Sequence, residues 1–184
     1  MRYFTALMWR GVQQRSGEQL DETYRKWDLA LQEYRQQLAA LRSRLDDEAF
    51  VFFDEADVHD GELLELRIMD GSRPAPLTSP ARPWETSMNY PVRVELAVLD
   101  AKEEFLWRLS YTGLRRVIVD FPGEQTLFYR TGEGFGDWGY HELTDAGNSF
   151  LRHEVLFASG SILTVEFKGV AVAKTPYRQT PLSA

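Results

Sequence analysis

The chain has 184 residues, with 28 aspartates and glutamates against 21 lysines and arginines, and it has no cysteine. The absence of cysteine excludes a disulfide framework, and the lack of a basic stripe argues against binding to the phosphates of nucleic acid. No apolar run approaches the roughly 20 residues that span a membrane, so we expect a soluble, cytoplasmic protein.

The first strong pattern predicts a long helix, because eight apolar residues recur at alternating spacings of four and three. They are Leu20, Tyr24, Trp27, Leu31, Tyr34, Leu38, Leu41 and Leu45. Ser16, with Gln19 three residues later, is typical of a capping box, so we predict a helix from Gly17 to Leu45. The stripe also suits a homodimer through Leu20–Leu45, but its flanking positions lack complementary charges and its aromatic residues suit a sheet surface better. We therefore favour packing on the protein's own sheet and keep the dimer as an alternative.

A second, short helix is predicted to begin at Asp46-Asp47 and to end near Glu55, because acids stabilise the positive end of a helix. The apolar run from Phe50 to Phe53 is equally compatible with a strand. The helical part then covers residues 16–57.

The rest of the chain predicts an antiparallel sheet over residues 62–70 and 92–173, with a proline-rich loop over residues 72–91 between them. Its predicted strands centre on Leu64–Ile68, Val92–Val98, Phe105–Tyr111, Val117–Phe121, Leu127–Tyr129, Trp138–Glu142, Leu151–Phe157 and Leu163–Phe167. The turns between strands are short, which requires antiparallel neighbours.

The predicted fold is thus a single α+β domain over residues 1–174. The long helix packs on a curved antiparallel meander of six to eight strands, a sandwich or half-barrel, and residues 175–184 form a flexible tail.

Three short stretches of the sequence resemble a bacterial family of unknown function. They are the opening Met1-Arg2-Tyr3-Phe4-Thr5 with Trp9, the His59-Asp60-Gly61 turn, and a C-terminal hairpin built from Trp138–Glu142, Phe150–Phe157 and Val165–Phe167. Members of that family begin Met-Lys-Tyr-Phe-Thr and continue with a helical first half. The resemblance implies a fold outline and no catalytic residues.

His141 and His153 form the most interesting pair of polar residues. If Asp145-Ala146-Gly147 is a three-residue loop, His141 opposes Leu151 and has His153 as a diagonal neighbour on the same face. A two- or four-residue loop would put the histidines on opposite faces. Since His153 lies between Leu151 and Val155 on an apolar face, a hydrogen-bonded core histidine is the first interpretation.

Other motifs are weaker. Gly134–Gly139 matches the glycine spacing of a dinucleotide loop but leads into a strand, and His59-Asp60 lacks the further ligands that a metal site needs. We therefore predict no cofactor and no metal, and we expect Asp60-Gly61 to form a turn.

The acidic charge is concentrated between Asp46 and Asp70, where ten acids face one base, Arg67; this balance of −9 leaves +2 on the other 159 residues. The first functional hypothesis is a non-catalytic binding protein that engages a basic protein partner through this segment, as an immunity protein masks a basic nuclease toxin.

The alternative is a ligand-binding protein or hydrolytic enzyme with a pocket near His141 and His153, lined by Trp107, Tyr129, Trp138 and Tyr140. The candidate binding residues of both hypotheses are Asp54, Glu55, Asp57, His59, Asp60, Trp138, Tyr140, His141 and His153.

Overall fold

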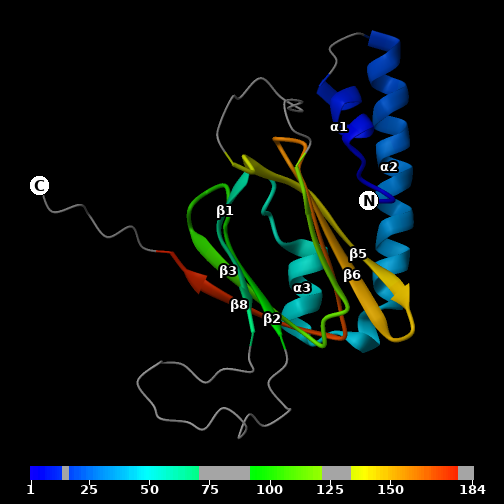
Figure 1. Cartoon of the computed structure of the whole chain (residues 1–184). Helices are drawn as coiled ribbons and strands as arrows, with labels where there is room; N and C mark the ends of the chain where they lie inside the picture. The colour runs from blue at the N-terminus through cyan, green and yellow to red at the C-terminus, as the bar shows by residue number, and fades with distance from the viewer. Residues whose placement is uncertain (14–16, 71–91, 122–133, 178–184) are drawn as a thin grey trace, which may run out of the picture.

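The computed structural model describes residues 1–13, 17–70, 92–121 and 134–177 (Figure 1). Its helices are α1 (Ala6–Gln13), α2 (Gly17–Ala40), the short 3-10 helix η1 (Arg42–Arg44) and α3 (Asp47–Glu55). Its strands are β1 (Gly61–Met69), β2 (Arg93–Leu99), β3 (Phe105–Thr112), β4 (Arg116–Asp120), β5 (Asp137–Gly147), β6 (Phe150–Phe157), β7 (Ile162–Phe167) and β8 (Gly169–Pro176).

All eight strands form one antiparallel sheet in the order β4-β7-β6-β5-β1-β2-β3-β8. Two meanders, β1-β2-β3 and β5-β6-β7, are joined where β1 pairs with β5, and β4 and β8 lie at the two ends of the sheet. The sheet is curved and does not close into a barrel (Figure 1). The predicted α+β class and the strand number are confirmed.

Helix α3 packs inside the curve of the sheet, between the two meanders (Figure 1). Asp46 caps it, because its side chain accepts a hydrogen bond from the N–H of Ala49 at 2.7 Å. Phe52 and Phe53 are buried, and the Phe52 ring lies 5.3 Å from the Trp107 ring of β3. The stretch that also suited a strand is therefore a helix.

Helix α2 packs along the other side of β5. The Trp27 ring contacts the Tyr140 ring at 4.5 Å, and the hydroxyl of Tyr34 accepts a hydrogen bond from the N–H of Leu143 at 3.2 Å. Leu38 is 1% exposed. The apolar stripe therefore faces the protein's own sheet, as predicted.

The helical boundaries differ from the prediction in two places. α2 ends at Ala40 and the chain tightens into η1, so a continuous helix to Leu45 is wrong. Helix α1 was not predicted; its buried Trp9 packs against the Tyr140 ring at 5.1 Å.

The β5–β6 hairpin has another register than the one predicted. Its loop is Asn148-Ser149, both with positive φ, and Asp145–Gly147 belongs to β5, so the predicted three-residue loop is wrong. His141 pairs with Val155, not with Leu151. A bulge between Asp145 and Gly147 shifts the pairing by one residue, and this restores the two histidines to one face.

The sheet also extends further toward the C-terminus than the predicted end at residue 173. β8 continues to Pro176, and the N–H of Tyr177 donates to the carbonyl of Glu104 at 2.8 Å, so residues 175 and 176 are not part of a tail. The predicted cap at Ser16, the proline-rich loop 72–91 and the strand at Leu127–Tyr129 lie outside the described residues.

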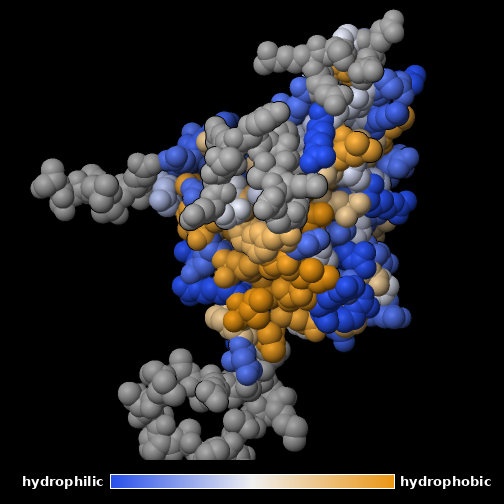
Figure 2. Space-filling model, turned by 45° about the horizontal axis from the view of Figure 1, so that its top comes forward, coloured by the Kyte–Doolittle hydropathy of each residue, from blue (hydrophilic) through white to orange (hydrophobic). Residues whose placement is uncertain are grey.

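Because the sheet is open, some apolar side chains of its strands contact solvent, among them Leu64 and Ile68 of β1. Figure 2 shows an apolar area on one face of the molecule, with hydrophilic residues around it.

Candidate functional site

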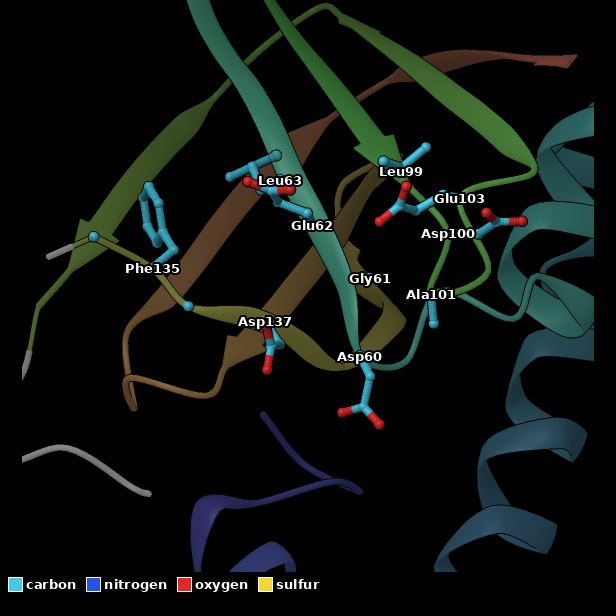
Figure 3. Close-up of a pocket in the computed structure, with 12 residues that line it drawn as sticks. Asp60, Gly61, Glu62, Leu63, Leu99, Asp100, Ala101, Glu103, Phe135 and Asp137 are labelled. Carbon is cyan, nitrogen blue, oxygen red and sulfur yellow. The ribbon is translucent and has the colours of Figure 1, made fainter. Parts of the chain in front are cut away.

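An acidic pocket opens where the first residues of β1 and β5 meet the turn between β2 and β3. Its volume is about 500 Å³. Five carboxylates line it: Asp60, Glu62, Asp100, Glu103 and Asp137. Figure 3 shows Phe135 at one end of the pocket and Asp100 with Glu103 at the other, with β1 between them. No lysine or arginine is among the described lining residues.

Strand pairing brings these acids together from three distant parts of the chain. Glu62 pairs with Leu99 on one side and with Asp137 on the other. The start of β1 therefore lies beside both the β2–β3 turn and the start of β5. In that turn, the side chain of Asp100 accepts hydrogen bonds from the N–H groups of Glu104 and Phe105 at 2.8 and 3.2 Å. The pocket therefore depends on the register in which β1 pairs with β2 and with β5.

The turn into β1 needs its particular residues. A Cβ on Gly61 would overlap the carbonyl of Leu99 and would lie 2.9 Å from that of Val58, so glycine allows β1 to approach β2 closely. Asp60 adopts a φ of 62°, which aspartate tolerates better than most residues. The predicted Asp60-Gly61 turn is confirmed.

His59 lies at the outer side of this turn, and its side chain is 40% exposed. Its Nδ1–H donates to the carbonyl of Gly139 at 2.8 Å, and its ring stacks on Tyr140 at 4.5 Å. Its Nε2 faces the carboxylate of Asp60 at 3.7 Å. Burial, then the charge of Asp60 and then Tyr24, raise the pKa of Tyr140 to about 12. The structure therefore gathers three predicted residues, His59, Asp60 and Tyr140, on one outer surface.

A second group of predicted residues, Trp138, His141 and His153, lies on the opposite face of β5; Trp138 and His153 are buried in the core, and His141 is half-buried at its edge. The indole N–H of Trp138 donates to Nδ1 of His141 at 3.0 Å, and the two imidazole rings lie 5.4 Å apart. Nδ1 of His153 is 2.6 Å from the hydroxyl of Tyr111, and its Nε2 is buried with no hydrogen-bond partner among the described residues. The predicted core histidine is therefore confirmed for His153.

Burial decides the protonation of this cluster. It lowers the pKa of His141 to about 4, and burial together with the neighbouring His141 lowers the pKa of His153 well below its usual range. Burial also raises the pKa of Tyr111. All three groups are therefore uncharged at neutral pH.

The histidine cluster does not open into a described pocket. His153 is 1% exposed, Trp107 5% and Trp138 0%, and neither histidine lines any of the four cavities described on this structure. Tyr129 lies outside the described residues. The arrangement found there is a packed core with internal hydrogen bonds.

The remaining predicted residues lie at the end of α3. Asp54 and Glu55 are exposed, and the carboxylate of Asp57 is 3.8 Å from the ammonium of Lys102. Glu55 and Asp57 line a second cavity of about 220 Å³, which shares Asp100 with the acidic pocket. Lys102 and Lys174 also line this cavity.

The acidic segment as a whole is not one surface. Asp46 caps α3, Asp47 pairs with Arg42, and Glu65 pairs with Arg67, all away from the pocket lining. The pocket instead recruits acids that the sequence analysis did not single out, namely Asp100, Glu103 and Asp137. A signal for the first two was present, since the turn between β2 and β3 reads Asp100-Ala101-Lys102-Glu103-Glu104 and three of its five residues are acidic. Nothing local pointed to Asp137.

The described residues contain neither a metal-binding cluster nor a membrane-spanning helix. Among them, no group of three or more histidine, cysteine, aspartate or glutamate side chains is arranged to hold a metal ion. None of the helices in the described ranges is long and apolar enough to cross a bilayer.

Comparison with models of protein families, with curated proteins and with solved structures finds no match to this chain. The resemblance to the bacterial family therefore stays a prediction.

Proposed function

We propose that this chain is a non-catalytic binding protein that engages a basic protein through its acidic pocket. One observation carries the proposal: five carboxylates surround a cavity of about 500 Å³ whose described lining contains no lysine or arginine. A one-signed concave surface attracts oppositely charged groups, and low-dielectric walls strengthen its field. Such a surface raises the association rate of a basic partner and selects against acidic ones.

The shape of the neighbouring surface supports a protein partner rather than a single ion. The second cavity continues from Asp100 toward Glu55 and Asp57, so acidic groups extend along the end of α3 beyond the pocket. Lys102 and Lys174 lie within this extension, and their positive charges would restrict the orientation in which a basic partner binds. A basic nuclease masked by an immunity-like protein is one concrete form of such a complex.

The chemistry of the lining favours binding over catalysis. Its described residues are carboxylates, glycines and apolar side chains, without histidine, serine, lysine or cysteine. A nucleophile with an adjacent base is therefore not formed there. No histidine is among the described residues that line the pocket: His153 is buried in the core, His141 is half-buried at its edge, and His59 lies at the outer side of the turn.

The test compares two variants that lose the same charge. The pocket variant carries Asp60→Asn, Glu62→Gln and Asp137→Asn, and the control carries the same types of change at Asp46, Asp47 and Glu48, at the opposite end of α3. Calorimetric titration with an octa-arginine peptide at low salt measures affinity. We expect the pocket variant to lose about tenfold in affinity and the control to stay within about twofold.

Two results would contradict the proposal. One is no binding of the peptide by the unaltered protein at low salt. The other is an equal loss in both variants, which would indicate a response to net charge alone. Capture of basic proteins from the native lysate, with release on raising the salt, then identifies the partner.

A further inference from the structure

The two meanders of the sheet are held together by a very short junction. β1 pairs with β5 only through Gly61 with Trp138 and Glu62 with Asp137 among the described residues. The N–H of Asp60 adds one hydrogen bond to the carbonyl of Trp138 at 2.8 Å. Asp60, Gly61, Glu62 and Asp137 also line the acidic pocket. Anything that loosens this junction therefore dismantles one wall of the pocket.

Trp138 connects the junction to the histidine cluster. Its backbone pairs with Gly61, while its side chain is 0% exposed and donates to Nδ1 of His141. An indole N–H is a donor only, so Nδ1 of His141 must be the acceptor and the neutral ring carries its proton on Nε2. The tautomer of His141 is thus set by the residue that forms the junction.

Proton uptake is incompatible with this arrangement. A second proton on His141 occupies Nδ1, which can then no longer accept the indole hydrogen bond, and a buried N–H of Trp138 faces another N–H. The titratable groups that face His141 are His153 from β6 and, hydrogen-bonded to His153, Tyr111 from β3. α3 presents only the rings of Phe52 and Phe53, at 5.1 and 5.9 Å.

No carboxylate offsets the new charge. In the described part of the chain, neither core imidazole is bonded to an acid, and Glu142 points to the opposite face of β5, toward the N-terminal residues. A second proton on His141 is therefore stable only after the indole of Trp138 has given up its hydrogen bond to Nδ1.

We propose that His141 and Trp138 form an acid-sensitive latch: proton uptake by His141 releases the Trp138 indole and opens the β1–β5 junction. The consequence for partner binding rests on the proposed function, whereas the opening itself does not.

The pH range follows from linkage. A solvated histidine has its ordinary pKa of 6.5, and burial lowers that of His141 to about 4 in the closed protein. The open state therefore gains about tenfold in population for each pH unit below 6.5, until the closed state is protonated near pH 4.

Nuclear magnetic resonance on the full chain tests the latch. At neutral pH, nitrogen shifts should show the Nε2–H tautomer of His141. The Asp60 N–H donates across the junction to the carbonyl of Trp138. On acidification, the exchange protection of this amide, corrected for the intrinsic pH dependence of exchange, should fall while that of Val155 in β6 is retained. The Trp138 indole resonance should lose its hydrogen-bonded shift over the same range.

Two variants isolate the cause. In His141→Asn, the side-chain oxygen replaces Nδ1 as the acceptor but takes up no proton, so the acid response should disappear. His59→Asn removes the other histidine near the junction together with its hydrogen bond to the carbonyl of Gly139, so the protection of the junction should be lower at every pH, but its fall on acidification should remain.

Three results would overturn the latch: an Nδ1–H tautomer, equal loss of protection in β6 and the junction, or a normal acid response in His141→Asn. The first two need no variant and so remain decisive if His141→Asn does not fold. Octa-arginine binding at neutral pH reports separately on the proposed function.

Discussion

Glu142→Gln should destabilise the protein by far more than its nearly isosteric shape suggests. Glu142 is fully buried on the face of β5 opposite the histidines. Its Oε2 accepts hydrogen bonds from the N–H groups of Tyr3 and Phe4 at 2.8 and 3.2 Å, and its Oε1 accepts one from the N–H of Arg2. These charge-assisted bonds fasten the N-terminal residues, and with them the start of α1, to the sheet.

The size of this destabilisation follows from the number of hydrogen-bond acceptors that the side chain at position 142 offers. Glutamine keeps one oxygen, so it can still serve Tyr3 and Phe4, but its amide group would point a donor at the N–H of Arg2. The protein loses one charge-assisted hydrogen bond and weakens two others, a cost of about 2–3 kcal/mol in the free energy of unfolding. That is a sizeable part of the roughly 5–15 kcal/mol that stabilises a typical domain.

Urea unfolding measures this cost, and amide exchange of Tyr3 and Phe4 shows where it arises. The control is Glu154→Gln: the Glu154 side chain is 14% exposed and pairs with the Met1 amine at 2.9 Å, so its loss should cost about 1 kcal/mol. A change below about 0.5 kcal/mol in Glu142→Gln, or unaltered protection of Tyr3 and Phe4, would refute the reasoning.

Three further predictions concern stability. Gly139→Ala should cost about 2–4 kcal/mol in urea unfolding, because its Cβ would overlap the Trp9 ring and lie 2.7 Å from the Leu156 carbonyl; Gly17→Ala, with open space around it, should cost nothing. Asp46→Ala should cost about 1 kcal/mol through loss of the α3 cap, whereas the asparagine variant should be near neutral. Unfolding measured over a pH series should show stability that is complete above the ordinary histidine pKa of 6.5 and lost as the pH falls toward about 4, since burial lowers the folded pKa of His141. The slope due to that residue should be about 1.4 kcal/mol per pH unit, and a pH-independent stability between those limits would contradict this assignment.

Elements whose periodic pattern of apolar residues repeats many times were predictable from the sequence. The α2 stripe extends over several turns, so its periodicity survives the early end at Ala40. The strands of the sheet alternate because the two faces of a strand have different surroundings, and this includes β6, where His153 and Val155 share the buried face. The α3 segment was ambiguous because four apolar residues fit either period; the Asp46 cap and burial inside the curved sheet make it a helix.

The acidic pocket was not predictable to the same extent, because it depends on contacts between distant residues. The charge count along the chain pointed to Asp60 and Glu62 but also to Asp46 and Asp47, which lie at the other end of α3. Asp137 joins the site only through its pairing with Glu62. α1 poses the same problem: Glu142, far along the chain, binds the N–H groups of the residues that lead into it.

The histidine hairpin shows why a site on a strand is harder to predict than the strand itself. Whether His141 and His153 share a face depends on whether the number of residues between them, corrected for bulges, is even or odd. The two-residue loop Asn148-Ser149 alone would separate them, and the bulge before Gly147 brings them back together. The predicted loop was wrong and yet the shared face was right, because the loop error and the omitted bulge cancel. A bulge has no reliable signal in the local sequence, so the conclusion about the shared face became secure only when the pairing of His141 with Val155 was known.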